Sequence, residues 1–353
     1  MIRYALIGFG GIAENRVAKE GFARDTKRFS APELYTLKGA TDLNPARQQA
    51  AEALGLVWYK SVDDILADRE IDAVYVATNN ASHAALAEKA LRAGKHVLVE
   101  KPMTTGIADA ENLIRIAGER NLSLAVDHMM INNAWNILAR NCVQSGKLGV
   151  INDSCFHMEF LFGADPAEAK TWRCANRAEM GGPVGDVASH CMYVAEFVFG
   201  EPIVKVAAVY YPKLMSMPVE DGAYVKFTLN SGMTGTVKCA FNEPRGGLGG
   251  TLGNLGYEIY GDKAALRGFG TMFQISGHKD EAVKIRLELD TFDKQENLVP
   301  PAIQNIYQVQ IGKHAKSILD GKRLTGEDAL HNLKLCDAIH RSAQNGGKLM
   351  EIK

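Results

Sequence analysis

The sequence lacks net charge and long apolar runs. Its 353 residues include 40 Lys and Arg against 41 Asp and Glu, which leaves a formal net charge of −1. With no long basic run, nothing favours binding to nucleic acid or to an anionic membrane surface. No apolar stretch approaches the roughly 18 residues that a membrane-spanning helix needs. We therefore expect neither a nucleic-acid-binding nor a membrane protein.

Cysteine is also sparse, and the six cysteines are scattered. None of them has C-x-x-C or Cys/His ligand spacing, which argues against a disulfide framework and a structural zinc site. They are Cys142, Cys155, Cys174, Cys191, Cys239 and Cys336. The first residues, MIRYALIGFG, enter a strand pattern without the layout of a signal peptide. We expect a cytoplasmic, reduced protein without a metal site.

The first part of the chain alternates strand-like and helix-like segments. Strand patterns occur in IRYALIG, ELYTLKGATD, DAVYVATN, KHVLVE and LSLAVDH, and segments with helical spacing separate them. Such alternation predicts a doubly wound parallel sheet, a Rossmann domain, over residues 1–126. The length favours a second domain, which we place at 127–353.

The second part has a different pattern. Several strand candidates follow a helical segment, and AYVKFTLN and MTGTVKCAFN flank a predicted hairpin turn at Ser231-Gly232. These segments predict an α/β domain with a large open, mostly antiparallel sheet. We expect a loop over 243–256 and two closing helices, near 302–320 and 326–345, which could pack back on the first domain.

A glycine motif follows the first strand and opens a helix. Gly8, Phe9, Gly10, Gly11, Ile12 and Ala13 fit G-x-G-x-x-G/A. Glycines allow the tight turn and the close approach of a pyrophosphate, and the helix N-terminus favours its negative charge. We expect these six residues to bind a dinucleotide. The alternative is a tight turn without a ligand.

An acidic residue should end the second strand and bind the adenosine ribose. Asp42 does so, although it lies further from the glycines than the usual spacing of about 20 residues. A carboxylate there repels a 2′-phosphate, which favours NAD over NADP. The nearby cation Arg47 argues in the other direction, for NADP. The alternative is that Asp42 is a turn residue before Asn44-Pro45.

Two further strand ends carry polar side chains. In an open parallel sheet, ligands bind beyond the carboxyl ends of the strands, so we expect further cofactor contacts here. The candidates are Thr78, Asn79, Asn80 and His83 after one strand, and Glu100 and Lys101 after the next. His83 alone could equally be a satisfied helix histidine. Pro102 biases Lys101 towards extended geometry, at the ligand edge of the sheet.

The stretch GGPVGDVASHCMYVAEFVFG is the informative motif of the second domain. Asp186 and His190 are four residues apart, so they share a face if this stretch is helical. A carboxylate beside an imidazole makes a plausible proton-handling pair. Equally, Asp186 could cap the helix and His190 could be a partly buried histidine.

The motifs together resemble the glucose–fructose oxidoreductase / inositol dehydrogenase (Gfo/Idh/MocA) family of NAD(P)-dependent sugar and polyol dehydrogenases. The resemblance rests on GFGGIA, ATNNASH, AGKHVLVEKP, TWR, GGPVGDVASH and TGEDAL, and it covers nearly the whole chain. It implies a Rossmann domain and a substrate-binding domain whose open sheet mediates dimers or tetramers. Lys101 resembles the catalytic lysine, His190 the general acid/base and Asp186 its partner. The segment DHMMINN departs from the family pattern and leaves the substrate open.

Further substrate contacts are expected from side chains near these motifs. His157 and Glu159 lie two apart on a predicted strand and so face the same way. Trp172 and Arg173 could supply an apolar wall and a donor, and His128 lies in DHMMINN. Each has a structural alternative, a solvated strand face or a core tryptophan.

Three functions fit the sequence. The first is a dehydrogenase that transfers a hydride between NAD and a ring secondary alcohol of a sugar, glycoside or cyclic polyol. The second cleaves a glycoside by transient NAD-dependent oxidation and elimination. The third is a sugar- or dinucleotide-sensing regulator without catalysis, against which the joint presence of Lys101, Asp186 and His190 argues.

Overall fold

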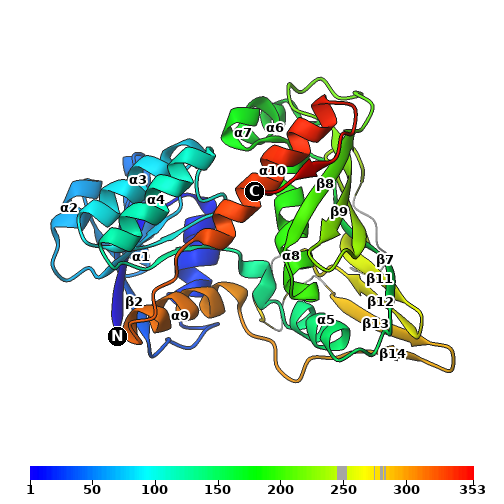
Figure 1. Ribbon diagram of the computed structural model, residues 1–353. Helices are drawn as coiled ribbons and strands as arrows, with labels where there is room; N and C mark the ends of the chain where they lie inside the picture. Colours follow the sequence, from blue (N-terminus) through cyan, green and yellow to red (C-terminus); the bar gives the residue numbers. More distant parts are fainter. Residues whose placement is uncertain (245–252, 274, 279–280, 282–283) are drawn as a thin grey trace. The chain divides into compact units, whose positions relative to one another are not determined.

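The computed structural model describes residues 1–244, 253–273, 275–278, 281 and 284–353 (Figure 1). Its contacts divide the chain into two compact units. Unit 1 contains residues 1–129, 276–278 and 304–331, and unit 2 contains 130–275, 279–303 and 332–353. Of the loop predicted over 243–256, residues 245–252 lie outside the described part of the chain.

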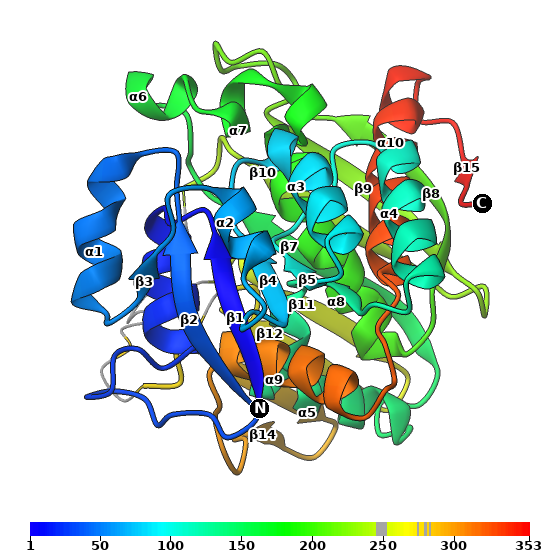
Figure 2. The ribbon, with the colours of Figure 1, turned by 90° about the vertical axis from the view of Figure 1, so that its left-hand side faces the viewer.

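Unit 1 contains the predicted parallel sheet. Its strands are β1 (Ile2–Ile7), β2 (Tyr35–Thr41), β3 (Val57–Trp58), β4 (Ala73–Val76), β5 (His96–Val99) and β6 (Leu124–Val126). Their order is β3-β2-β1-β4-β5-β6, and all neighbours are parallel (Figure 2). The direction of winding reverses between β1 and β4, and ligands of such sheets bind at that point, beyond the carboxyl ends of the strands. The predicted Rossmann fold is confirmed.

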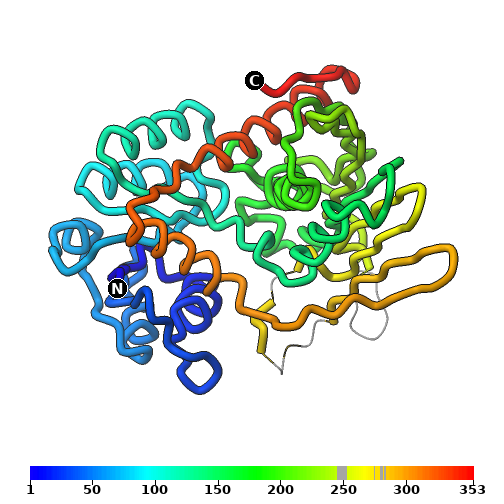
Figure 3. Tube along the Cα trace, turned by 60° about the horizontal axis from the view of Figure 1, so that its bottom comes forward, coloured from blue at the N-terminus to red at the C-terminus, as the bar shows by residue number. Residues whose placement is uncertain are grey.

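Helices cover both faces of this sheet. Helices α3 (Asn80–Arg92) and α4 (Ile107–Glu119) contact each other on one face. On the other face, the π-helix η1 (Ala13–Gly21) packs beside α9 (Ile306–Leu319), a neighbour from near the end of the chain (Figure 3). Along the chain, η2 (Pro45–Arg47) and α1 (Gln48–Ala53) follow β2, and α2 (Val62–Ala67) follows β3. The 3-10 helix η3 (Met129–Asn132) follows β6.

Unit 2 is built on a nine-stranded sheet in the order β14-β13-β12-β11-β7-β10-β9-β8-β15. Its strands are β7 (Ile151–Glu159), β8 (Ile203–Tyr210), β9 (Gly222–Leu229), β10 (Thr234–Ala240), β11 (Leu255–Gly261), β12 (Ala264–Phe269), β13 (Arg286–Thr291), β14 (Gln295–Asn297) and β15 (Met350–Glu351). Only β7 and β10 pair in parallel among these strands. The mostly antiparallel sheet and the β9–β10 hairpin agree with the prediction.

One face of the large sheet packs on helices, and this packing forms the core of unit 2. Helices α5 (Ala134–Gln144) and α8 (Ser189–Phe199) contact each other, and α8 lies against β7, where the Phe156 and Phe199 rings stand 6.0 Å apart. The π-helix η5 (Val184–Ala188) leads directly into α8. Unit 2 also contains α6 (Pro166–Ala169), α7 (Trp172–Ala175) and η4 (Arg177–Glu179), and α10 (Glu327–Gln344) begins in unit 1 and ends in unit 2. Among the described residues, no helix combines the length and apolarity required to cross a bilayer.

Candidate active site

The glycine turn of unit 1 holds β1 and β4 close together at the reversal point. Gly8 has φ +92°, and a Cβ atom on it would lie 2.6 Å from the Ala77 carbonyl oxygen, so only glycine fits there. A Cβ atom on Gly10 or Gly11 would meet nothing within 4 Å, so the space beside them is open. This open turn at the start of a helix suits the pyrophosphate of a dinucleotide.

Asp42 and Arg47 both bind the residue at the centre of this turn. The Phe9 amide donates to Asp42 Oδ2 at 2.6 Å, and Arg47 Nε donates to the Phe9 carbonyl oxygen at 2.7 Å. Arg47 also forms an ion pair with Glu14. The hydrogen bond from Lys19, assisted by that from Arg47, holds the pKa of Glu14 below its ordinary value against partial burial. Glu14 is therefore shared by two cations, Lys19 and Arg47.

His83 joins the segments that follow β4 and β5. It is fully buried, with Nδ1 2.8 Å from the Pro102 carbonyl oxygen and Nε2 3.2 Å from the Thr78 carbonyl oxygen. Burial is the main cause that lowers its pKa. A neutral ring can donate only one hydrogen bond, and the shorter contact assigns that proton to Nδ1. In this position His83 fixes the backbone next to Lys101.

The other predicted residues of these two strand ends lie nearby in unit 1. Asn79 is the N-cap of α3, and Asn80 is buried in its first turn. Ser82 Oγ donates to the Thr78 hydroxyl at 2.7 Å and also bonds Asn79. Glu100 accepts a hydrogen bond from Tyr75, and Lys101 is partly exposed, with a cis peptide bond to Pro102. The predicted cofactor residues thus gather along the carboxyl edge of the sheet.

In unit 2, the acid and the imidazole occupy a buried helical segment. Asp186 lies in η5 and His190 in the first turn of α8, and both are less than 10% exposed. Arg173 Nε donates to Asp186 Oδ2 at 3.2 Å, while its guanidinium lies over the Trp172 ring, 4.6 Å from the ring centroid. The motif TWR therefore supplies a cation for Asp186.

Tyr193 is a partner of His190 that the sequence reasoning missed. Its hydroxyl oxygen lies 2.6 Å from His190 Nδ1, and both side chains are buried. The two residues are three apart on α8, a spacing that places side chains on one helix face. The same helical argument that paired Asp186 with His190 could have found it.

His157 and Glu159 share a strand face, as their spacing predicts, and lie 3.5 Å apart. They project from β7 on the face opposite Phe156, the side chain that packs on α8. Lys238 binds the same Glu159 oxygen at 3.0 Å. Burial opposes protonation of His157, but Cys155 and Glu159 raise its pKa to about 10. His157 and Glu159 thus lie on the other face of β7 from Phe156, although Glu159 is buried and its charge still acts on the Cys191 thiol of α8.

His128 is buried at the end of β6 in unit 1. Its Nδ1 atom lies 3.3 Å from Asp328 Oδ2, at the start of α10. Asp328 belongs to the motif TGEDAL, which the sequence singled out only for its resemblance. This contact orients the His128 ring.

Two family profiles match the chain. The profile of the oxidoreductase family with an NAD-binding Rossmann fold, Gfo/Idh/MocA, matches residues 2–128, and the profile of the Gfo/Idh/MocA C-terminal domain matches residues 137–267. A 1,5-anhydro-D-fructose reductase from Ensifer adhaerens is 27% identical over 291 residues, 81% of each chain.

Solved structures share the fold over almost the whole length. A levoglucosan dehydrogenase in complex with NADH and levoglucosan aligns with a TM-score of 0.79 at 20% identity, over 99% of both chains. A 3-ketoreductase from Actinomadura kijaniata in complex with NADP and TDP-benzene aligns with a TM-score of 0.81 at 23% identity, over 97% of both chains. These neighbours bind different nicotinamide cofactors.

Proposed function

Because this chain belongs to the Gfo/Idh/MocA family of oxidoreductases, we propose that it transfers a hydride between NAD and a ring secondary alcohol of a sugar, glycoside or cyclic polyol. The proposal rests mainly on the carboxyl edge of the parallel sheet. An open glycine turn, Asp42 and Lys101 each follow the end of a strand there. When bound, NAD would supply the hydride acceptor.

We assign the proton chemistry to Lys101, Asp186 and His190. Oxidation of an alcohol releases a proton from its hydroxyl group as the hydride leaves carbon. A lysine ammonium group stabilises the negative charge that develops on that oxygen. His190 accepts the proton, and Asp186, held by Arg173, supports the imidazolium charge. In the reverse direction the same groups return the proton to a ketone.

Two contacts favour NAD over NADP in this proposal. Asp42 places a carboxylate beside the glycine turn, where it would bind ribose hydroxyls and repel a 2′-phosphate. Arg47, the nearby cation that could attract such a phosphate, is engaged by Glu14 and by the Phe9 carbonyl oxygen. The remaining cofactor contacts would come from Thr78, Asn79, Asn80, Glu100 and Lys101, with His83 holding their backbone in place.

A sugar or a related cyclic compound is the proposed substrate because the relatives act on such compounds by name, an anhydrofructose and levoglucosan. Trp172 offers an apolar ring and Arg173 a cation beside Asp186. We assign these two residues and His128 to substrate binding. His157 and Glu159 are weaker candidates, because they lie on the sheet face away from α8.

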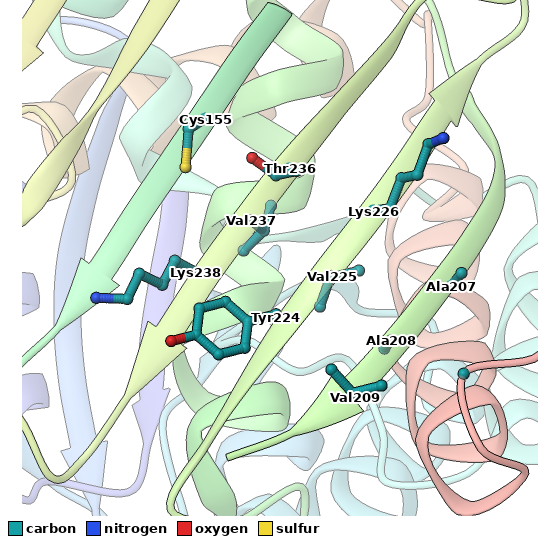
Figure 4. Close-up of a pocket in the computed structure, with 11 residues that line it drawn as sticks. Cys155, Ala207, Ala208, Val209, Tyr224, Val225, Lys226, Thr236, Val237 and Lys238 are labelled. Atoms are coloured by element: carbon teal, nitrogen blue, oxygen red, sulfur yellow. The ribbon is translucent and has the colours of Figure 1, made fainter.

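We further propose that the chain forms a homodimer or homotetramer through the open face of the large sheet. This face exposes Val209 and Tyr224, which are 48% and 52% exposed. They line a cavity of about 390 Å³ over β7, β8, β9 and β10, shown in Figure 4. Exposed apolar surface of this kind marks protein–protein contacts.

A substrate screen tests the proposal. Sugars, glycosides and inositols would be offered with NAD and with NADP, and the absorbance of the reduced cofactor followed. The proposal predicts steady NADH formation with at least one cyclic alcohol. Product analysis runs in parallel, since cleavage of a glycoside without NADH release would contradict net oxidation. Preference for NADP would refute the assignment of Asp42.

A further inference from the structure

Tyr75 and Asp127 are buried titratable groups beneath the end of β5, and the function proposed above does not use them. Tyr75 is fully buried, and its hydroxyl oxygen lies 2.6 Å from Asp127 Oδ2 and 3.0 Å from Glu100 Oε1. Two carboxyl groups therefore share one hydroxyl group, in the unit that carries Lys101.

The strand register brings these three side chains together. Tyr75 pairs with Leu98 across β4 and β5, and Leu98 pairs with Ala125 across β5 and β6. Side chains alternate between the faces of a sheet, so residues two apart face the same way. Glu100 and Asp127, each two residues further along, thus meet Tyr75 on one face. The arrangement follows from the fold and does not depend on a loop.

The hydrogen bonds require a proton on one of the two carboxyl groups. A phenol hydroxyl has one hydrogen and donates one hydrogen bond, although its oxygen can also accept. Tyr75 has two carboxyl oxygens within hydrogen-bond distance. Both contacts are hydrogen bonds of full strength only if one carboxyl group donates to the Tyr75 oxygen.

Burial indicates which group carries that proton. Asp127 is 1% exposed, and its Oδ1 has no hydrogen-bond partner among the described residues. Glu100 is partly exposed. An ionised carboxylate with a buried, unpaired oxygen is costly. Burial first, and then the negative charge of Glu100, raise the pKa of Asp127 well above its ordinary value, against the effect of the Tyr75 bond.

Other titratable groups face the cluster from α9 and η1. The Tyr307 hydroxyl is buried without a partner among the described residues. Burial, Glu100 and Asp127 raise its pKa, so it stays neutral. Arg16 and Glu20 of η1 also act on Tyr307, but they form an ion pair with each other at 2.9 Å. The positive charge of Arg16 is therefore paired with the negative charge of Glu20.

We propose that Tyr75 and Asp127 are positioning residues for Glu100: a protonated Asp127 donates to the Tyr75 oxygen, and Tyr75 donates to an ionised Glu100. The cluster then holds a single negative charge at a fixed place next to Lys101 in the sequence. A negative charge at a fixed place keeps the electrostatic potential at Lys101, the proposed catalytic lysine, constant. This last consequence rests on the proposed function, whereas the proton on Asp127 does not.

A second tyrosine–aspartate pair in the chain serves as a matched control for the proton on Asp127. Tyr59 donates to Asp68 at the same distance of 2.6 Å, but Asp68 is only partly buried, whereas Asp127 is 1% exposed. The bond from Tyr59 is the main cause that lowers the pKa of Asp68. The two pairs share their geometry and differ in burial, so replacement of each aspartate by asparagine should have opposite effects on the pH dependence of stability.

The first experiment uses the protein without cofactor. Between about pH 4 and the raised pKa of Asp127 in the folded state, wild type keeps a proton on Asp127 that the unfolded chain has released, so its folding constant falls by about tenfold per pH unit relative to Asp127→Asn. Thermal midpoints between pH 4.5 and 8 should therefore diverge in favour of Asp127→Asn, and not in favour of Asp68→Asn. The infrared difference spectrum between wild type and Asp127→Asn should contain a protonated carboxyl band. Parallel midpoints and no such band would overturn the proposal.

The second experiment tests positioning, with a substrate from the screen. Tyr75→Phe should lower kcat/KM by about tenfold or more and shift its pH profile, because Glu100 loses its donor. Tyr59→Phe should leave both unchanged. If Tyr75→Phe keeps the wild-type profile, positioning is refuted. If the screen finds no substrate, the proposed function fails, and the first experiment still decides the proton on Asp127.

Discussion

His190 Nδ1 lies 2.6 Å from the Tyr193 hydroxyl oxygen, one turn along the same helix. The Tyr193 hydroxyl can donate to Nδ1 or accept from it, so this contact couples Tyr193 to the choice of ring nitrogen that carries the proton in neutral His190. For Nε2 to accept a proton from an alcohol, Nδ1 must keep its own proton and donate it to Tyr193. Tyr193 would thus prepare His190 as a base.

Replacement of Tyr193 by phenylalanine removes that acceptor and keeps the ring. We expect kcat for alcohol oxidation to fall by about tenfold, a part of the roughly 10²- to 10⁴-fold that acid–base catalysis contributes. The pH profile of kcat should shift as well. Tyr260→Phe, on strand β11, is the control and should behave as wild type. An unchanged kcat profile in Tyr193→Phe would show that the contact only packs the helix.

Asp42 should set the choice of cofactor. Asp42→Ser removes the carboxylate that repels a 2′-phosphate, so the ratio of kcat/KM with NAD to that with NADP should fall by about tenfold or more. Asp63→Asn changes an exposed aspartate of the same unit and should leave the ratio unchanged. The assignment fails if Asp42→Ser keeps the wild-type ratio.

His83 should affect both stability and NAD binding, because it holds the backbone segments that follow β4 and β5. His83→Ala leaves the Pro102 carbonyl oxygen without its donor and opens a cavity, at a cost of about 2–4 kcal/mol in the free energy of unfolding. NAD should bind less tightly to the folded variant, because the segments after β4 and β5 lose their link. Denaturant unfolding and fluorescence titration with NADH measure the two effects. A stable variant with wild-type affinity would contradict this role.

Stability should decline in acid because of a second buried histidine. His314 accepts or donates a 2.8 Å hydrogen bond with Tyr4, and burial lowers its pKa to about 3. The unfolded chain therefore binds a proton below about pH 6.5 that the folded chain does not. The free energy of unfolding should fall with decreasing pH, by about 1.4 kcal/mol per unit from this residue. His314→Asn should remove that part of the slope; equal slopes would refute it.

Much of unit 1 could be predicted because each strand end carries its own local signal. The glycines after β1, Asp42 after β2 and Lys101 before Pro102 lie next to one another in the fold because parallel strands share a carboxyl edge. The pairing of Tyr75 with Asp127 could not be predicted, since it needs the register of three strands. The sequence did suggest that the closing helices could pack back on the first domain, but it did not indicate that α9 lies beside η1, almost 300 residues away along the chain.

The second unit was less predictable in detail. The parallel pairing of β7 with β10 has no local signal, because it joins strands that other strands and helices separate along the chain. A strand as short as β15 lacks a readable alternation. The π-helical turn at Asp186 also has no sequence pattern of its own, and the pairing of Asp186 with His190 stays a prediction from their spacing.

Lys101→Met tests most directly whether Lys101 takes part in hydride-transfer chemistry. With a substrate from the screen, we expect kcat to fall by about 10²-fold or more, because the ammonium group that stabilises the developing oxygen charge is gone. Lys89→Met, on the exposed face of α3, should keep full activity. Circular dichroism should show both variants folded. A Lys101→Met enzyme that retained wild-type turnover with every accepted substrate would contradict the account.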